Sequence, residues 1–211
     1  MTLNDIAENI FTINLIRRKD RFDHFMEQTN KFDFHAMVTA AVDSKEIVNP
    51  TNLRPGEYAL LLSYAKIIEW AKLRAWDKII ILEDDVVFED DLNDRLEREW
   101  KLIPDNWDLV YLGENNCSLG AGWLPSTPVN ESIRRIYSSF GAHAIVIKSH
   151  MYNRILDGIM KFDKPLDVMY CDLQSSSHTY GFNRPLAKQK SFESDIIGFN
   201  PMYLEQGVFD K

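Results

Sequence analysis

A short apolar run followed at once by three acidic residues is the feature that most constrains this sequence. Residues 78–82, KIIIL, continue directly into Glu83, Asp84 and Asp85. The run has no alternation of polar and apolar residues, which is typical of a central strand covered on both faces. In open α/β sheets, ligands bind beyond the carboxyl ends of the strands. The sequence therefore predicts a central strand whose end carries these acidic residues into a ligand site.

Strand-like and helix-like segments alternate along the rest of the chain. Apolar runs predict strands at residues 10–15, 34–41, 107–112 and 142–147, and helical patterns cover 20–31, 53–76, 90–102, 149–160 and a stretch from Pro165. Residues 114–135 and the tail after Arg184 are predicted to be irregular. The alternation favours an α/β fold with a mostly parallel central sheet and flanking helices. A length of 211 residues fits a single domain spanning 1–211.

Charge is concentrated in two segments of opposite sign. The net charge is −8, and residues 83–99 hold nine carboxylates against two arginines. A cationic turn, formed by Arg17, Arg18, Lys19 and Arg21, follows the first predicted strand. The acidic balance disfavours broad binding to nucleic acid or anionic membranes. The two opposed segments suit an anionic ligand that carries a metal ion, and the alternative is that both are solvated surfaces.

Several common kinds of site are absent from the sequence. It contains no phosphate-binding glycine loop, no GxSxG nucleophile motif and no HExxH zinc motif. Cys117 and Cys171 lack the paired spacing of a zinc or redox site. No apolar run reaches the roughly 18 residues of a transmembrane helix, and Asp5 and Glu8 interrupt any signal peptide pattern. We therefore expect a soluble, cytoplasmic protein.

Three adjacent carboxylates at a strand end repel one another and stay ionised only when a cation joins them. Mg²⁺ and Mn²⁺ prefer oxygen ligands and often share them with substrate phosphates. Glu83, Asp84 and Asp85 thus suit a site for a divalent ion and a diphosphate. The alternative interpretation is an acidic turn that caps the following helix, and the residues alone favour neither.

Six short blocks carry a resemblance to a known family. They are residues 13–15 (INL) with Arg17, Arg18 and Arg21, 55–57 (PGE) with Ser63, 81–85 (ILEDD), 107–109 (WDL) with 111–113 (YLG), 164–167 (KPLD) and 194–196 (SDI). In this order they resemble glycosyltransferase family 25, which includes lipooligosaccharide and collagen galactosyltransferases. The sequence departs from the family pattern at Ala59, where a second glycine is usual, and at Tyr64, where the family has a histidine. The second departure leaves the sugar specificity open.

The resemblance implies a GT-A-type, Rossmann-like fold that transfers sugars from nucleotide diphosphates. Glu83 and Asp85 would then face a divalent Mn²⁺ or Mg²⁺ that bridges the two donor phosphates. The residues implied in binding the donor are Asn14, Arg17, Arg21, Gly56, Glu57, Ser63 and Asp84. Arginine offers forked donors to phosphate, and a helix N-terminus favours anions. For Arg21 the alternative is a surface ion pair with a helix carboxylate.

The implied reaction is the inverting transfer of a hexose, galactose or glucose, from a UDP-sugar to a hydroxyl of a glycan or another acceptor, as in lipooligosaccharide synthesis. The metal ion would neutralise the departing diphosphate, and a carboxylate would take the proton of the acceptor hydroxyl. Asp167 in the 164–167 block is the first choice for this base, and Asp172 is the second. Two alternatives stay open: a catalytically idle sugar-nucleotide-binding protein, favoured by Tyr64, and a transferase that acts on modified DNA bases.

The long segment at residues 114–135 is expected to act as a lid. It contains Gly120, Gly122, Pro125 and Pro128, too many helix breakers for a helix. Trp123 would stack on a sugar ring, and closure of the segment would exclude water from the donor. The alternative is that Trp123 anchors the segment on the core.

Overall fold

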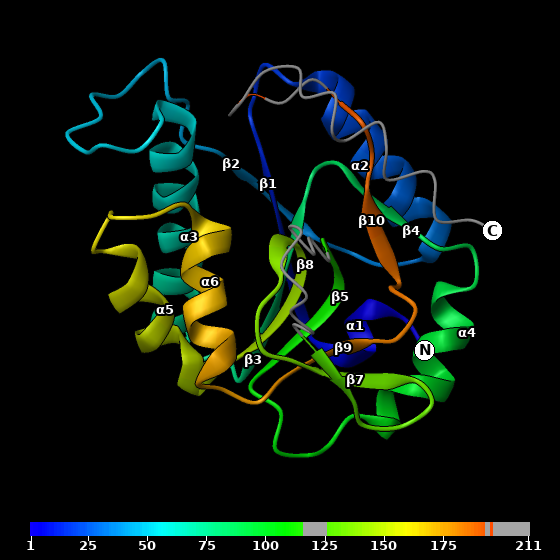
Figure 1. Ribbon diagram of the computed structural model, residues 1–211. Coiled ribbons are helices and arrows are strands. Elements are labelled where there is room, and N and C mark those ends of the chain that lie inside the picture. Colours follow the sequence, from blue (N-terminus) through cyan, green and yellow to red (C-terminus); the bar gives the residue numbers. More distant parts are fainter. Residues whose placement is uncertain (116–125, 193–194, 196–211) are drawn as a thin grey trace.

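Helices cover both faces of a central sheet in the computed structural model, which describes residues 1–115, 126–192 and 195 (Figure 1). The strands are β1 Asn9–Asn14, β2 Met37–Ala40, β3 Lys78–Glu83, β4 Val86–Phe88, β5 Leu109–Asn115, β6 Ser126–Pro128, β7 Ile133–Ile136, β8 Phe140–Lys148, β9 Thr179–Phe182 and β10 Ala187–Gln189. The helices are α1 Leu3–Ile6, α2 Lys19–Phe32, α3 Pro55–Leu73, α4 Leu92–Glu99, α5 Tyr152–Ile159 and α6 Leu166–Ser175, with 3₁₀ turns η1 Trp100–Leu102 and η2 Ser149–Met151. None of these helices combines the length and the apolar character needed to cross a membrane.

Eight of the described strands form the main sheet, in the order β2-β1-β3-β8-β5-β9-β7-β6. β1 runs parallel to β2 and β3, and β5 runs parallel to β9. β8 is antiparallel to both β3 and β5, so these two strands share a direction, and β7 is antiparallel to β9 and β6. Six of the eight strands therefore point the same way, and β7 and β8 are reversed. The predicted α/β fold with a mostly parallel sheet and flanking helices is confirmed.

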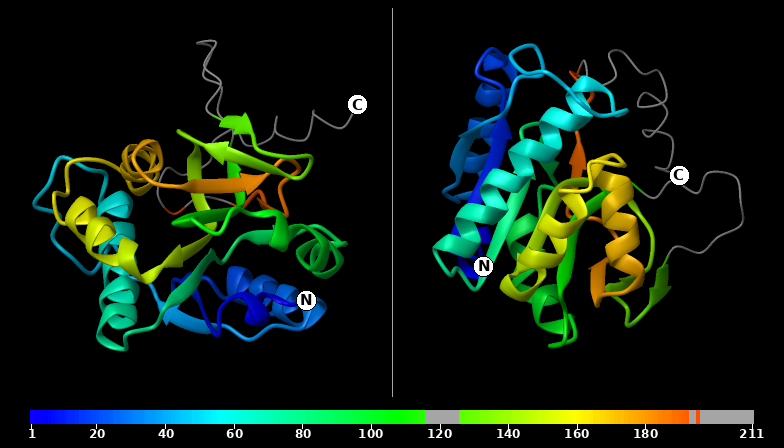
Figure 2. Two further views of the ribbon diagram at one scale, coloured as in Figure 1. Left: turned by 90° about the horizontal axis from the view of Figure 1, so that it is seen from below. Right: turned by 90° about the vertical axis from the view of Figure 1, so that its left-hand side faces the viewer.

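β3 is the central strand that the apolar run predicted. Ile80 and Leu82 pack with α1, α2 and α4 on one face, whereas Ile79 and Ile81 pack with α3, α5 and α6 on the other. All four side chains are completely buried, and burial of a side chain of this size stabilises the fold by about 1.5–3 kcal/mol. Figure 2 shows the helix layers from two further directions, and in its right-hand view α3, α5 and α6 lie in front of the sheet.

Local signals explain where two long helices begin and end. α3 has Pro55 at its first position, and the Glu57 carboxylate accepts a hydrogen bond of 2.9 Å from the backbone N–H of Arg54. Proline has no N–H to leave unpaired in a first turn, and the carboxylate satisfies a donor that the helix cannot. α2 ends at Asp33, whose positive φ of 53° turns the chain out of the helix. Both helices match the predicted ranges to within a few residues.

Two predictions of irregular structure were wrong in part. Residues 126–136, inside the segment predicted as a long loop, form a hairpin of β6 and β7, and β7 pairs with β9. The tail after Arg184 contains β10, which pairs antiparallel with β4 immediately after the acidic residues (Figure 1). β6 and β10 have three residues each. Strands this short leave little periodic signal in the sequence.

Candidate active site

The candidate site lies at the edge of the sheet where the parallel strands end. Asn14 ends β1, Glu83 ends β3 and Asn115 ends β5, and Asn115 pairs with Phe140, the first residue of the reversed strand β8. α3 and α6 lead into β3 and β9 respectively, so the N-termini of both helices lie toward this same edge. Because helix N-termini favour negative charge, an anionic ligand is favoured there.

Asp84 is a buried anchor in this site. Its Oδ2 accepts a hydrogen bond of 2.7 Å from Asn14 Nδ2, and its Oδ1 lies 2.6 Å from Arg21 Nη1. The side chain is 7% exposed. The structure thus brings together three residues that the resemblance assigned to donor binding. Both carboxylate oxygens of Asp84 are already used, and they tie the cationic turn to the end of β3.

Asp85 keeps one carboxylate oxygen open. Its Oδ2 lies 3.2 Å from Arg21 Nη1, whereas its Oδ1 is buried and has no hydrogen-bond partner among the described residues. Glu83 Oε2 accepts a hydrogen bond of 2.9 Å from Gln189 Nε2. Burial, followed by the charges of Asp85 and Asp84, raises the pKa of Glu83, and burial raises the pKa of Asp85 against the opposing effect of Arg21. The negative charge of Glu83 and Asp85 is therefore incompletely compensated by the protein.

This pair of carboxylates fits a divalent ion that is shared with a substrate. In the part of the chain that the structure describes, no three His, Cys, Asp or Glu side chains are grouped so that they could hold a metal ion. Mg²⁺ is usually held by one or two carboxylates together with substrate phosphates, not by a cage made of protein alone. The open Oδ1 of Asp85 and the carboxylate of Glu83 supply a pair of this kind.

The arginines of the cationic turn already have carboxylate partners. Arg17 Nε lies 2.8 Å from Asp43 Oδ2, and Arg17 Nη1 lies 2.6 Å from Asp195 Oδ1. Arg18 pairs with Asp195 as well. Arg21 is mostly buried, and its partners are the carboxylates after β3 instead of a helix carboxylate at the surface. A donor phosphate at this turn must therefore compete with acidic side chains of the protein.

The residues implied near the start of α3 lie at different depths. Gly56 and Glu57 belong to its first turn, where Glu57 caps the helix. Ser63 lies deeper and is 1% exposed. Its hydroxyl donates to the carbonyl of Ala59 at 2.8 Å and accepts from the backbone N–H of Val42 at 2.9 Å. Ser63 thus joins α3 to the segment that follows β2, and its hydrogen bonds are made within the protein.

Tyr64, which stands where the family has a histidine, belongs to the core. Its side chain is completely buried, and its hydroxyl donates to the Ala142 carbonyl at 2.7 Å. The ring packs edge-to-face against Tyr170, with ring centres 6.5 Å apart. Burial raises the pKa of Tyr64 well above its ordinary value. The tyrosine is therefore a neutral packing residue that links α3 to the start of β8.

The two candidate bases on α6 differ in their surroundings. Asp167 lies in the first turn, is partly buried, and its charge acts on Glu83. Burial raises the pKa of Asp167, and the nearby charge of Glu57 acts in the same direction. Asp172 lies roughly 140° further round an ideal helix. It is exposed and pairs with Lys164 at 2.7 Å, so of the two only Asp167 lies partly buried at the start of the helix.

Three residues of the site were missed by the sequence analysis. Gln189 on β10 contacts Glu83, and Asn115 Nδ2 donates to Gln189 Oε1 at 2.9 Å. The ring centre of Phe192 lies 5.3 Å from the guanidinium carbon of Arg21. No motif marks any of the three. The pairing of β10 with β4 brings Gln189 and Phe192 to the site, and Asn115 stands at the end of β5.

Trp123 and its neighbours at residues 116–125 lie outside the described residues, so the lid hypothesis stays a prediction. The described ends of that segment belong to the sheet. Glu114 in β5 is buried and pairs with Arg134 in β7. This contact joins β5, which precedes the segment, to β7, which follows β6.

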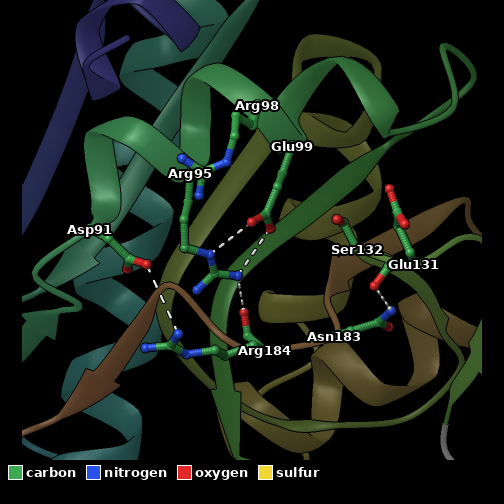
Figure 3. Close-up of a pocket in the computed structure, with 8 residues that line it drawn as sticks. All are labelled: Asp91, Arg95, Arg98, Glu99, Glu131, Ser132, Asn183 and Arg184. Carbon is green, nitrogen blue, oxygen red and sulfur yellow. Dashed lines mark hydrogen bonds and ion pairs between the residues drawn. The ribbon is translucent and has the colours of Figure 1, made fainter.

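A separate pocket lies beside α4 (Figure 3). It has a volume of about 230 Å³ and is lined by Asp91, Arg95, Arg98, Glu99, Glu131, Ser132, Asn183 and Arg184. Figure 3 shows Arg95 reaching to Glu99, whose carboxylate oxygens lie 2.9 and 3.0 Å from two of its nitrogens. The pocket carries both signs of charge and shares no residue with the acidic site.

Comparison with known proteins finds low similarity, and only to solved structures. No protein-family model matches the chain, and no curated protein matches it. The chain is similar to a mannose-1-phosphate geranyltransferase from Thermus thermophilus, with 10% identity and a TM-score of 0.45 over 85% of this chain and 75% of that one. It is also similar to the glycosyltransferase GlyE of Streptococcus pneumoniae, with 12% identity and a TM-score of 0.46 over 83% of this chain and 45% of that one.

A third similar structure is described as a glycosyltransferase involved in the glycosylation of the major capsid of PBCV-1. The identity is 11% and the TM-score 0.40, over 72% of this chain and 66% of that one. Similarity at this level assigns no activity and no family. The resemblance to family 25 therefore rests on the sequence blocks, and the function is argued from the site.

Proposed function

We propose that the protein is a metal-dependent glycosyltransferase of GT-A type. It transfers a hexose, galactose or glucose, from a UDP-sugar to a hydroxyl of a glycan or another acceptor, as in lipooligosaccharide synthesis. The observation that carries the proposal is the incompletely compensated pair of Glu83 and Asp85 at the carboxyl end of the central strand, with Asp85 Oδ1 buried and unpartnered. In α/β folds this is the edge at which ligands bind.

The residues around Glu83 and Asp85 suit a metal-bound diphosphate, in which the metal ion is positively charged and the phosphates are negatively charged. Glu83 and Asp85 would hold Mn²⁺ or Mg²⁺, which when bound supplies Lewis-acid stabilisation of the departing diphosphate. Arg17 and Arg21, just before and within the first turn of α2, offer forked donors to phosphate oxygens. The first turn of α3, with Gly56, presents backbone N–H groups at the same edge.

Asp167 is the proposed general base. A base is most effective when its pKa lies near the working pH, and burial raises the pKa of the Asp167 carboxyl toward that range. Its Oδ1 accepts a hydrogen bond of 2.8 Å from the backbone N–H of Val168, which orients the carboxylate. Asp172 is the second candidate. We expect inversion at the anomeric carbon, as the family resemblance implies.

Nucleotide-sugar binding and turnover test the proposal. Thermal melts with a panel of UDP-sugars, each with and without Mn²⁺, should show stabilisation by one donor that depends on the ion, because a ligand that binds the folded state raises its stability. UDP release in the presence of acceptor sugars should then follow. Absence of any Mn²⁺-dependent stabilisation across the panel would contradict the proposal.

A catalytically idle donor-binding protein is the second candidate. Tyr64 in the place of the family histidine favours it, because the buried tyrosine hydroxyl is committed to the Ala142 carbonyl and offers nothing to a ligand. Binding of UDP-sugar and Mn²⁺ without UDP release would support this candidate. Transfer to modified DNA bases, which the net charge of −8 disfavours, is tested by including such DNA among the acceptors.

A further inference from the structure

Among the residues that the structure describes, Gln189 is the neutral side chain that hydrogen-bonds to the acidic pair of Glu83 and Asp85. It lies on β10, where it pairs with Val86 of β4, the residue directly after Asp85. Its Nε2 donates to Glu83 Oε2 at 2.9 Å. The same amide faces Asp85, whose pKa burial raises while Arg21 and Gln189 oppose the shift. The amide therefore contacts Glu83 and lies close to Asp85.

The orientation of this amide is determined by its neighbours. An ionised carboxylate only accepts hydrogen bonds, so toward the ionised Glu83 that a cation requires, Gln189 turns its NH₂ group and points its oxygen away. That oxygen accepts a hydrogen bond of 2.9 Å from Asn115 Nδ2 at the end of β5. Asn115, Gln189 and Glu83 thus form a directed chain from one strand end to another, across β10.

The backbone on each side of Gln189 is held close to the site. The N–H of Lys190 donates to the carbonyl of Asp85 at 2.8 Å, and the N–H of Leu186 donates to the carbonyl of Leu112 at 2.7 Å. Gly113 permits this approach, because a Cβ at that position would lie 2.2 Å from the carbonyl oxygen of Ala187. β10 therefore cannot move away from the carboxylates without breaking contacts on both sides.

We propose that Gln189 is a positioning residue that holds the carboxylates of Glu83 and Asp85 ready for a shared divalent cation. An amide donor orients carboxylates without adding a positive charge, so it leaves the charge of the pair available to the metal ion. Arg21 occupies only Oδ2 of Asp85, and Oδ1 stays open. This inference rests on the metal site of the proposed function and adds the residue that sets its geometry.

Mn²⁺ and UDP binding, measured by calorimetry on the intact protein, test this role. Q189L removes both hydrogen bonds at nearly constant volume and should weaken Mn²⁺-dependent UDP binding about tenfold, while UDP binding without the ion changes little. K188L is the matched control, because Lys188 is on the same strand, is exposed and pairs with Glu89 at 3.3 Å; it should bind like the parent. N115A combined with Q189L should add no further loss, because Asn115 acts through the Gln189 amide.

A second variant covers the case in which Q189L does not fold. Q189K places an ammonium group beside the two carboxylates, which satisfies them and preserves the fold but excludes a second cation, so Mn²⁺ binding should be lost. Parent-like, Mn²⁺-dependent UDP binding by Q189L or by Q189K would overturn the role of Gln189 and leave the proposed function standing. Failure of the parent protein itself to bind UDP with Mn²⁺ would overturn both.

Discussion

Arg21 Nη1 lies 2.6 Å from Asp84 Oδ1, although the two residues are 63 positions apart in the chain. Both side chains are largely buried. The ion pair joins the cationic turn before α2 to the acidic end of β3, so the two oppositely charged segments of the sequence form one site. It also separates the roles of the acidic residues, since Asp84 is occupied by Arg21 and Asn14 while Asp85 keeps an oxygen open.

Replacement of Asp85 tests the metal site directly. Asp85→Ala should abolish Mn²⁺-dependent UDP binding and leave the fold intact, because the side chain stands at the end of the strand and Arg21 keeps Asp84 as a partner. Calorimetry with UDP and Mn²⁺ measures the first effect, and circular dichroism checks the second. Parent-like binding in Asp85→Ala would mean that the metal lies elsewhere.

Removal of the Arg21–Asp84 pair should lower stability as well as affinity. Loss of one partner from a buried ion pair leaves an uncompensated charge and costs about 3–5 kcal/mol. We therefore expect Arg21→Ala, which leaves Asp84 and Asp85 without their cation, to lower the free energy of unfolding by about 3 kcal/mol in urea titrations. Asp84→Ala should lower it by less, because Arg21 keeps its pair with Asp85. The double variant should lose much less than the sum of the two, because the second substitution removes the stranded charge. Additive losses would show that the pair does not act as a unit.

Substitution of the two candidate bases should affect the transfer rate differently. Asp167→Asn should lower the transfer rate about 10²–10⁴-fold, the usual contribution of a general base, while UDP and Mn²⁺ still bind. Asp172→Asn serves as its control, because this side chain is exposed and pairs with Lys164, and its rate should match the parent. UDP release with acceptor present gives both numbers. A larger loss in Asp172→Asn than in Asp167→Asn would reverse the assignment.

Asp195 should compete with the donor for the cationic turn. Its carboxylate contacts Arg17 and Arg18, the groups expected to meet phosphate. Asp195→Asn should therefore raise the affinity for UDP several-fold, and the gain should shrink at high salt because ionic strength screens exposed charges. Asp23→Asn is the control. It changes the net charge of the protein by the same amount, but Asp23 lies on α2 and pairs with Lys19, so the affinity for UDP should not change. Lower UDP affinity in Asp195→Asn would show that Asp195 supports the turn.

His143 should make the stability of the protein depend on pH. The side chain is completely buried, and burial lowers its pKa to about 4, whereas an unfolded histidine has a pKa of about 6.5. Between these values the unfolded state binds a proton that the folded state does not, so the free energy of unfolding falls as the pH falls, by up to about 1.4 kcal/mol per unit.

Urea titrations between pH 7 and pH 4 measure this effect. His143→Gln removes the titrating ring and should flatten the slope by up to about 3 kcal/mol over that range. The remaining slope belongs to the acidic groups and to His24, whose pKa burial also lowers. Equal slopes in the parent and the variant would contradict the assignment of this pH dependence to His143.

The sequence by itself determined the elements whose signal is local. The run before Glu83 has too few polar residues for an exposed strand, and the structure places it in the centre of the sheet with both faces buried. The ranges of α2 and α3 follow from periodicity and from signals such as Pro55. The sequence also placed Glu83, Asp84 and Asp85 at the end of the central strand, and the structure agrees. Ligand binding at this edge, which is usual in α/β folds, stays a prediction.

Only the tertiary structure decided how the charged groups of that site are paired. Composition and periodicity do not separate Asp84 from Asp85, and only the family resemblance assigned them different roles. In the structure they differ because Arg21 and Asn14 occupy both oxygens of Asp84, whereas Asp85 Oδ1 has no partner among the described residues. Gln189 reaches Glu83 through a three-residue strand with no periodic signal of its own. The pairing of remote strands and the burial of ion pairs depend on which surfaces meet when the chain folds. Hydrophobic periodicity is a property of residues close together in the sequence, so it does not predict which remote surfaces will meet.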